Sequence, residues 1–190
     1  MFLHHQPRKT SRKWANSALI LLFCALFCAC TPTFNWRDVR LESADGSSLK
    51  AALPCKPDTA TRKQQLSDIQ VGLSMVGCVA NETTFTLSHI LLTNPLDAPR
   101  VLAAWQAAGA ANVKAKPAPM SAAIVSGAGA WPPAARVTLN GAQTQAHMLW
   151  FAKQTATGVT LYQAALYGKQ PSSEAITEVA VTFFESLQLQ

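Results

Sequence analysis

Hydrophobic and polar residues alternate along several stretches of the chain, which is the period-two pattern of strands with one buried face. Residues 83–92 show it clearly, because Phe85 and Leu87 stand between threonine and serine residues. The preceding segment, residues 66–80, is also rich in apolar residues, and residues 81–82 separate the two. The pattern predicts a β-hairpin.

Short turn signals separate the other predicted strands. Asp45-Gly46 and Asn140-Gly141 are pairs typical of hairpin turns, and Gly158 marks a further turn. Prolines after Leu53 end the first hairpin, and the polar residues up to Gln65 predict a loop. The strands predicted around these turns are residues 39–43, 49–53, 136–139, 142–153 and 159–167.

Two segments carry apolar residues at the three- and four-residue spacing of helices. Val101, Trp105 and Ala108 predict a helix at about residues 98–110, and a second apolar stripe predicts one at about residues 173–187. Antiparallel hairpins combined with two helices predict an α+β fold, in which an antiparallel sheet is flanked by helices.

Residues 116–134 interrupt the regular pattern with alanine, proline and glycine. We expect a long connection here, with a short strand at residues 122–126. Trp131 stands in this stretch beside Pro132, where the pattern offers no buried face. It either docks on a partner or folds back over the sheet, and it is our candidate partner contact.

The first thirty residues form a unit of their own, because a basic segment is followed by an uninterrupted apolar run. Arg8, Lys9, Arg12 and Lys13 precede the run at residues 18–30. This order is typical of the helix of a secretory signal peptide. The run has 13 residues, whereas a membrane-spanning helix needs about 20. A retained single-span anchor is the alternative interpretation.

The end of the apolar run, Phe27-Cys28-Ala29-Cys30, resembles a bacterial lipobox. In that family the cysteine after a small residue is acylated and becomes the first residue of the mature chain. The resemblance implies acyl chains such as palmitate on Cys30, which hold the protein at a membrane. In that family an aspartate directly after the acylated cysteine commonly retains the protein at the inner membrane. This chain has Thr31 at that position, which favours the outer membrane. Phe27 and Cys28 depart from the usual residues, so cleavage without lipid attachment is the alternative.

Composition limits what the rest of the chain can be. A chain of 190 residues with 49% apolar and 14% charged residues fits one globular domain, which we place at residues 31–190. The net charge of +6 includes the signal peptide, which contains four of the 16 basic residues. The rest of the chain has 12 basic and 10 acidic residues, a net charge of +2. This near-neutral balance predicts no nucleic-acid partner.

Cys55 and Cys78 are the cysteines that remain after Cys30 and the signal peptide are set aside. An even pair of cysteines in an exported chain predicts one disulfide bond. Two buried free thiols are the alternative.

Candidate chemistry is sparse. His89 and His147 are too few ligands for a metal site, and we expect neither a metal nor a cofactor. The sequence carries no nucleophile-elbow motif and no phosphate-binding loop. A periplasmic enzyme of unrecognised type that uses His89 or His147 is the alternative to a non-catalytic domain.

The order of elements resembles that of small proteobacterial-type envelope lipoproteins with a PsbP-like domain. The segments that carry the resemblance are LKAALPCKP at residues 49–57, TLYQAALYG at residues 160–168 and FFESLQL at residues 183–189. The resemblance implies an α/β/α sandwich over about residues 36–190, and it implies no particular function. We therefore expect a lipoprotein on the periplasmic face of a membrane, whose domain binds an envelope protein or a small ligand or has a role in assembly.

Overall fold

Ten strands, two α-helices and one 3₁₀ helix make up the part of the chain that the computed structural model describes, residues 34–169 and 174–190. The predicted signal peptide, with Cys30, lies outside the described residues. The elements in chain order are β1 (Arg37–Glu42), β2 (Ser48–Leu53), β3 (Asp58–Leu66), β4 (Ile69–Ala80), β5 (Thr83–Leu92), η1 (Pro95–Asp97), α2 (Ala98–Asn112), β6 (Ser121–Ala122), β7 (Ala135–Asn140), β8 (Thr144–Thr155), β9 (Gly158–Lys169), α3 (Glu174–Glu185) and β10 (Gln188–Leu189).

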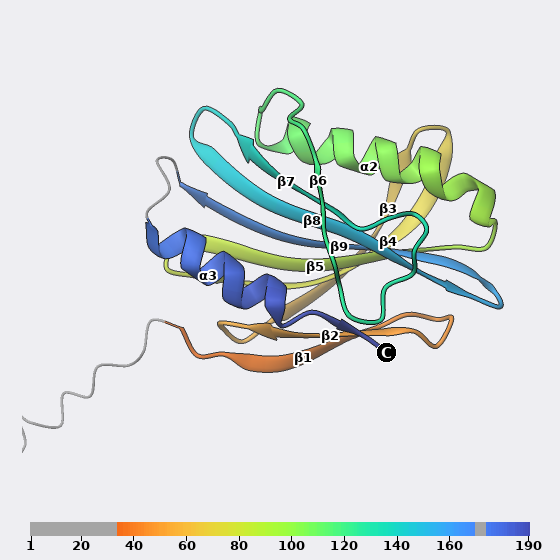
Figure 1. The fold of residues 1–190 in the computed structure, drawn as a ribbon, viewed down its shortest axis with the longest axis horizontal. Coiled ribbons are helices and arrows are strands. Elements are labelled where there is room, and N and C mark those ends of the chain that lie inside the picture. Colours follow the sequence, from red (N-terminus) through yellow and green to blue (C-terminus); the bar gives the residue numbers. More distant parts are fainter. Residues whose placement is uncertain (1–33, 170–173) are drawn as a thin grey trace, which may run out of the picture. The chain divides into compact units, whose positions relative to one another are not determined.

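Two antiparallel sheets organise these elements (Figure 1). The larger sheet has the strand order β3-β4-β5-β9-β8-β7-β6, and the smaller sheet has the order β1-β2-β10. The predicted hairpins are present, since β1 pairs with β2, β4 with β5, β7 with β8, and β8 with β9. The predicted α+β class is confirmed.

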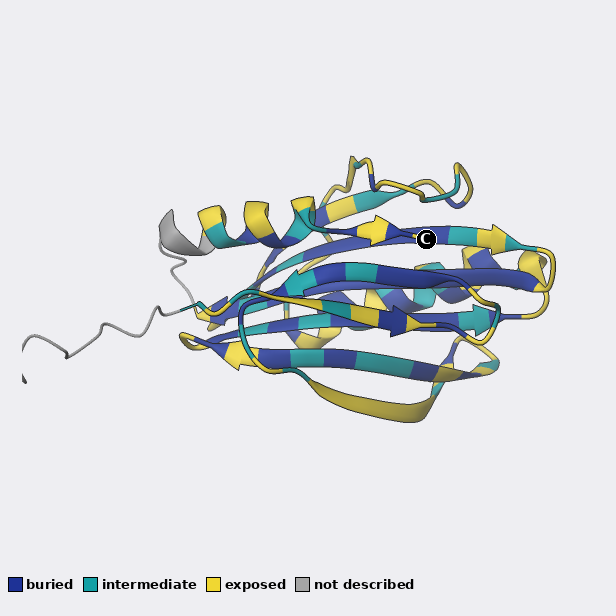
Figure 2. Ribbon diagram, turned by 90° about the horizontal axis from the view of Figure 1, so that it is seen from below, coloured by how far each residue is buried: buried dark blue, intermediate teal, exposed yellow. Residues whose placement is uncertain are grey.

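Each face of the larger sheet is covered by a different layer. On one side, which we call the α2 face, Trp105 of α2 packs in a core with Met148. On the other side, the α3 face, Phe183 of α3 and Leu49 of β2 pack with Phe85. The layer on the α3 face therefore contains the small sheet as well as a helix, which differs from a plain α/β/α sandwich. Figure 2 shows dark blue along the central strands and yellow on the outer surface of α3.

Strand β3 corrects the prediction of a loop up to Gln65. It pairs with β4 from Asp58 opposite Gly77 to Leu66 opposite Ile69. It is an edge strand and is exposed along most of its length. An edge strand is held by backbone hydrogen bonds to one neighbouring strand. Because β3 buries little of either face, its side chains need not alternate between apolar and polar. The polar composition that indicated a loop is thus that of an edge strand.

The C-terminal helix is shorter than predicted. It ends at Glu185, and Gln188–Leu189 add a short strand to β2. Leu187 and Leu189 are both buried in the core of the α3 face. Leu187 fits the apolar spacing of the helix, and together with Leu189 it also fits the alternating spacing of a strand. The apolar pattern therefore does not show at which residue the helix ends.

The Asn140-Gly141 pair does not form the predicted two-residue turn. Three residues separate β7 from β8, and the Gly141 N–H donates to the Thr144 carbonyl at 2.9 Å. A Cβ on Gly141 would lie 1.8 Å from the carbonyl oxygen of Val113, just after α2. Glycine is required here because the loop approaches this carbonyl closely.

The long connection between α2 and β7 contains the two-residue strand β6 in place of the strand predicted at residues 122–126. Residue Ser126 forms an isolated parallel bridge with Gln188. The connection therefore touches the small sheet as well as β7.

The Asp45 carboxylate fastens the β1–β2 turn to the larger sheet. One of its oxygens accepts hydrogen bonds from the Ser47 N–H at 3.0 Å and the Ser47 hydroxyl at 2.6 Å, and the other accepts from Thr160 at 2.7 Å. The Ser47 oxygen lies 2.7 Å from the Tyr162 hydroxyl. Burial by itself would raise the pKa of Asp45, but the bonds from Ser47 and Thr160 outweigh it and lower the pKa from 3.8 to about 2.

The Cys55–Cys78 disulfide joins the two sheets, and this confirms the predicted pair. Cys55 follows β2 of the smaller sheet, and Cys78 lies in β4 of the larger sheet. Their α-carbons are 5.9 Å apart, and 23 positions of sequence separate them. The bond closes a loop that contains all of β3.

We expect the Cys55→Ser/Cys78→Ser variant to lose about 2–4 kcal/mol of unfolding free energy, because the open loop gains conformational freedom in the unfolded chain. Urea unfolding of the purified protein with and without reductant measures the loss. Reductant should lower the midpoint of the native protein and leave that of the variant unchanged. Equal midpoints for the native protein and the variant without reductant would contradict the stabilising role.

Candidate functional site

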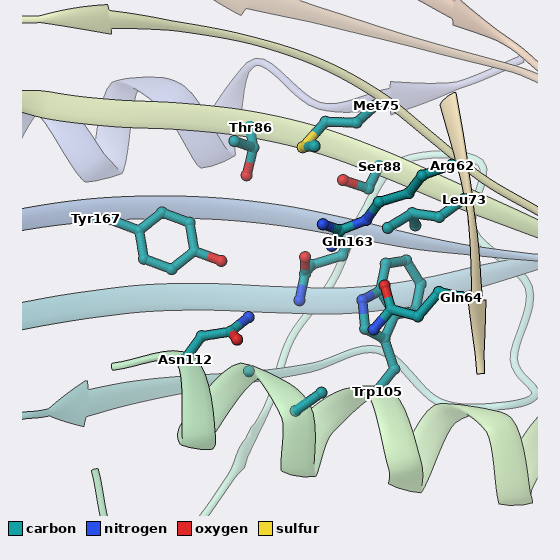
Figure 3. A pocket seen from close by; sticks show the side chains of 12 residues that line it. Arg62, Gln64, Leu73, Met75, Thr86, Ser88, Trp105, Asn112, Gln163 and Tyr167 are labelled. Atoms are coloured by element: carbon teal, nitrogen blue, oxygen red, sulfur yellow. The ribbon is translucent and has the colours of Figure 1, made fainter. Parts of the chain in front are cut away.

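A cavity of about 160 Å³ lies on the α2 face, between the C-terminal half of α2 and the strands β3, β4, β5 and β9 (Figure 3). We call it the α2 pocket. Gly109 lets the helix approach the sheet closely here, because a Cβ at this position would lie 2.9 Å from the sulfur of Met148. The lining residues are Arg62, Gln64, Leu73, Met75, Thr86, Ser88, Trp105, Ala108, Gly109, Asn112, Gln163 and Tyr167.

Polar side chains from four elements converge on the α2 pocket. Gln163 of β9 is 6% exposed and Ser88 of β5 is 3% exposed, and both line the pocket. Neither side chain forms a hydrogen bond with the rest of the described chain, and the same holds for the side chains of Asn112 and Tyr167. Buried polar groups in folded proteins nearly always have hydrogen-bond partners. These groups are therefore available to a bound molecule.

The Gln64 carboxamide extends this set of unsatisfied groups. Its oxygen is fully buried and has no hydrogen-bond partner in the described chain. Gln64 lines the pocket together with the Trp105 indole, which supplies an apolar wall with Leu73. The cavity thus combines hydrogen-bonding groups with an aromatic surface, as small-molecule sites do.

Arg62 is the one charged residue that lines the α2 pocket. In Figure 3 its guanidinium group and the ring of Tyr167 extend from opposite ends toward Gln163. Burial raises the pKa of the Tyr167 phenol, and the positive charge of Arg62 opposes that increase. Arg62 therefore brings the one formal charge among the described lining residues, on a side chain that is exposed.

A wider groove of about 470 Å³ continues along the α2 face beyond the helix. It shares Met75 and Thr86 with the α2 pocket. Its other lining residues include the oppositely charged Lys56 and Asp58 and the exposed Val79. The wider groove is therefore a direct neighbour of the α2 pocket.

Sequence reasoning missed this pocket for an identifiable reason. Two of its polar residues, Arg62 and Gln64, lie in β3, which the sequence predicted as a loop. Gln163 was the available signal, since it is the one amide side chain within the strand at residues 159–167. A polar residue inside a strand buried on both faces indicates a site or a hydrogen-bond network.

The structure does not bring His89 and His147 together. His89 lies opposite Tyr162 and His147 opposite Leu166, on either side of β9, which separates them by about 14 Å along the strand. His89 is buried against the ring of Tyr162, with ring centroids 5.9 Å apart. His147 lies within hydrogen-bond distance of Thr138 at 3.1 Å. Neither histidine lines the α2 pocket or the wider groove.

Trp131, the candidate partner contact, is 41% exposed. The same connection also exposes Met120 at 48% and Ile124 at 99%. Trp131 therefore does not fold back fully into the core, and its role as a partner contact stays a prediction. Cys30, the predicted lipidation site, lies outside the described residues.

Within residues 34–169 and 174–190, no three His, Cys, Asp or Glu side chains gather closely enough to hold a metal ion. None of the helices in this described part is long and apolar enough to cross a membrane.

Comparison with known proteins adds little to this geometry. No family model matches the chain, and no curated protein sequence matches it. Among solved structures, the chain is similar to the crystal structure of LpqN, a protein involved in cell envelope biogenesis of Mycobacterium tuberculosis. The two chains are 12% identical with a TM-score of 0.44, over 82% of this chain and 92% of the other. This similarity supports no conclusion about function, and the PsbP-like resemblance stays a prediction.

We expect the unfolding free energy to fall as the pH is lowered from 7.5 to 5.5. Burial lowers the pKa of His89 and of His147 below 6.5, although the charge of Asp45 partly opposes this at His89. Stability is therefore complete above pH 6.5 and is lost as the pH falls toward the folded-state pKa values, because the unfolded chain binds protons first. The slope is at most about 1.4 kcal/mol per pH unit for each histidine.

Urea unfolding of the native protein and of the His89→Gln/His147→Gln variant measures this dependence. The variant should show a smaller decrease between the two pH values. The same decrease in both proteins would rule out the histidines as its source.

Proposed function

We propose that this chain is a lipid-anchored envelope protein whose domain is non-catalytic and binds a small polar molecule in the α2 pocket. The observation that carries the proposal is the buried, unpartnered Gln163 and Ser88, which face a cavity of about 160 Å³. The Gln64 oxygen beside them is wholly buried without a partner in the described chain, and leaving such a group unbonded costs about 1–3 kcal/mol. A bound ligand supplies the missing hydrogen bonds.

The anchoring part of the proposal rests on residues 1–30. The basic segment, the apolar run and the lipobox-like residues that end at Cys30 together favour export and acylation. The Cys55–Cys78 disulfide supports the same compartment, because such bonds persist in oxidising environments. Acylation of Cys30 would hold the domain at the periplasmic face of a membrane, and Thr31 favours the outer membrane.

A protein partner is a second candidate for binding at a different surface. The connection between α2 and β7 exposes Ile124 almost completely and Trp131 in part. Contiguous exposed apolar patches mark protein interaction sites, and these two side chains would form the centre of one if they lie together. This contact would give the domain the assembly role, and it leaves the α2 pocket free.

We expect Cys30→Ala to release the protein from the membrane or to leave the precursor uncleaved, because the acyl chains provide the anchor. Fractionation of bacterial cells and the size of the processed chain measure both effects. Cys24→Ala is the matched control and should leave attachment unchanged. A Cys30→Ala protein that is processed to the native size and stays membrane-bound would make the apolar run the anchor.

We expect Ala108→Leu to abolish small-molecule binding, because the larger side chain fills the α2 pocket while leucine preserves the helix. The test is a thermal-shift screen of the full-length protein in mild detergent against a library of small polar compounds. Ligands that raise the melting temperature of the native protein should have no effect on the variant.

Ala107→Leu is the control, since the adjacent Ala107 is exposed and does not line the pocket. It should respond to ligands as the native protein does. If Ala108→Leu and Ala107→Leu respond alike to every ligand, binding in the α2 pocket is excluded.

A further inference from the structure

We propose that the ligand of the α2 pocket is a small organic carboxylate that carries a hydroxyl group at its opposite end, with Arg62 as the counterion of the carboxylate. This inference rests on the proposed function and adds the chemical class of the ligand.

The charge of the pocket selects an anion. Among the described residues, Arg62 is its one charged lining residue, and no aspartate or glutamate lines it. Arg62 forms no ion pair or hydrogen bond within the described chain. Arg100 provides the contrast, since it forms ion pairs with both Asp68 and Asp97. The guanidinium group of Arg62 is thus free to bind an acid from outside the chain.

A carboxylate suits this environment better than a phosphate. A guanidinium group presents a planar fork of donors that matches the two oxygens of a carboxylate. A dianion is normally bound by several cations or by a set of backbone N–H groups. The pocket offers one cation, and α2 contributes the residues of its C-terminal half.

The other end of the pocket favours a hydrogen-bond donor. Asn112 is the last residue of α2, and the carbonyl groups at a helix C-terminus carry partial negative charge. Figure 3 places Asn112 and Tyr167 at the end away from Gln64 and Leu73. A ligand hydroxyl at this end would donate to the Asn112 side-chain oxygen or to Tyr167, while the carboxylate meets Arg62.

The size of the cavity sets the body of the ligand. A cavity of about 150 Å³ in another protein accommodates benzene, and the α2 pocket measures about 160 Å³. Trp105, Leu73 and Met75 supply apolar surface for a ring or a short carbon chain. Gln163 and Ser88, between the two ends, donate to or accept from its polar substituents.

Three compounds of the same shape and different charge test the inference: 4-hydroxybenzoate, 4-hydroxybenzamide and 4-hydroxybenzylamine. Isothermal titration calorimetry with the full-length protein in mild detergent at low ionic strength gives each dissociation constant. We expect the acid to bind severalfold more tightly than the amide, because Arg62 is exposed and solvent screens its charge, and the amine more weakly than both. Added salt should reduce the advantage of the acid.

Arg62→Gln identifies the counterion. It should weaken binding of the acid severalfold and leave binding of the amide unchanged. Lys63→Gln removes the same charge from the next residue of β3, which does not line the pocket, and should change neither.

Equal binding of the three compounds, or equal effects of Arg62→Gln and Lys63→Gln, would overturn the choice of a carboxylate. Binding of neutral compounds alone, sensitive to Ala108→Leu and not to Ala107→Leu, would also overturn it and would leave the proposed pocket function intact. Failure of the proposed function itself appears differently, as binding that responds equally to Ala108→Leu and Ala107→Leu.

Discussion

The structure depends on burying both faces of the seven-stranded sheet. Seven strands spaced about 4.8 Å apart form a surface about 29 Å wide, and its 12-residue strands run for about 40 Å. A helix of 15 residues is about 22 Å long and about 10 Å wide. One helix cannot cover such a face, so the α2 face is closed in part and open in part. The α2 pocket and the wider groove lie where that cover ends.

The α3 face is closed more completely, because the small sheet lies beside α3 over the same strands. This layer is tied to the larger sheet at two places. Asp45 and Ser47 bond to Thr160 and Tyr162 at the turn of the β1–β2 hairpin, and Cys55 is linked to β4 beyond its other end. The small sheet is thus fixed to the larger sheet at both ends, which stabilises the α3 face. The α2 face, which is covered less densely, retains polar groups that can bind a ligand.

The polar residues of the α2 pocket lie in a sheet whose interior is otherwise largely apolar. Ser88 and Gln163 occupy buried positions of central strands, and their polar groups face the pocket without a hydrogen bond to the described chain. Departures of this kind from the rules of folding are expected at functional positions. The proposed ligand would explain why these polar residues lie at buried positions, since it would form the hydrogen bonds that the rest of the chain does not provide.

The sequence by itself determined the hairpins, the first helix, the α+β class and the cysteine pair, because period-two and helical patterns report directly which side chains are buried. It also contained the polar Gln163 that points to the site. Only the tertiary structure showed that residues 58–66 form an edge strand, that Leu189 pairs with β2, and that Gly141 packs against the backbone just after α2. Each of these depends on backbone contact with a segment distant in the sequence, which leaves little trace in local polarity. The pocket belongs to the same class, since it arises where four strands and one helix fail to fill the space between them.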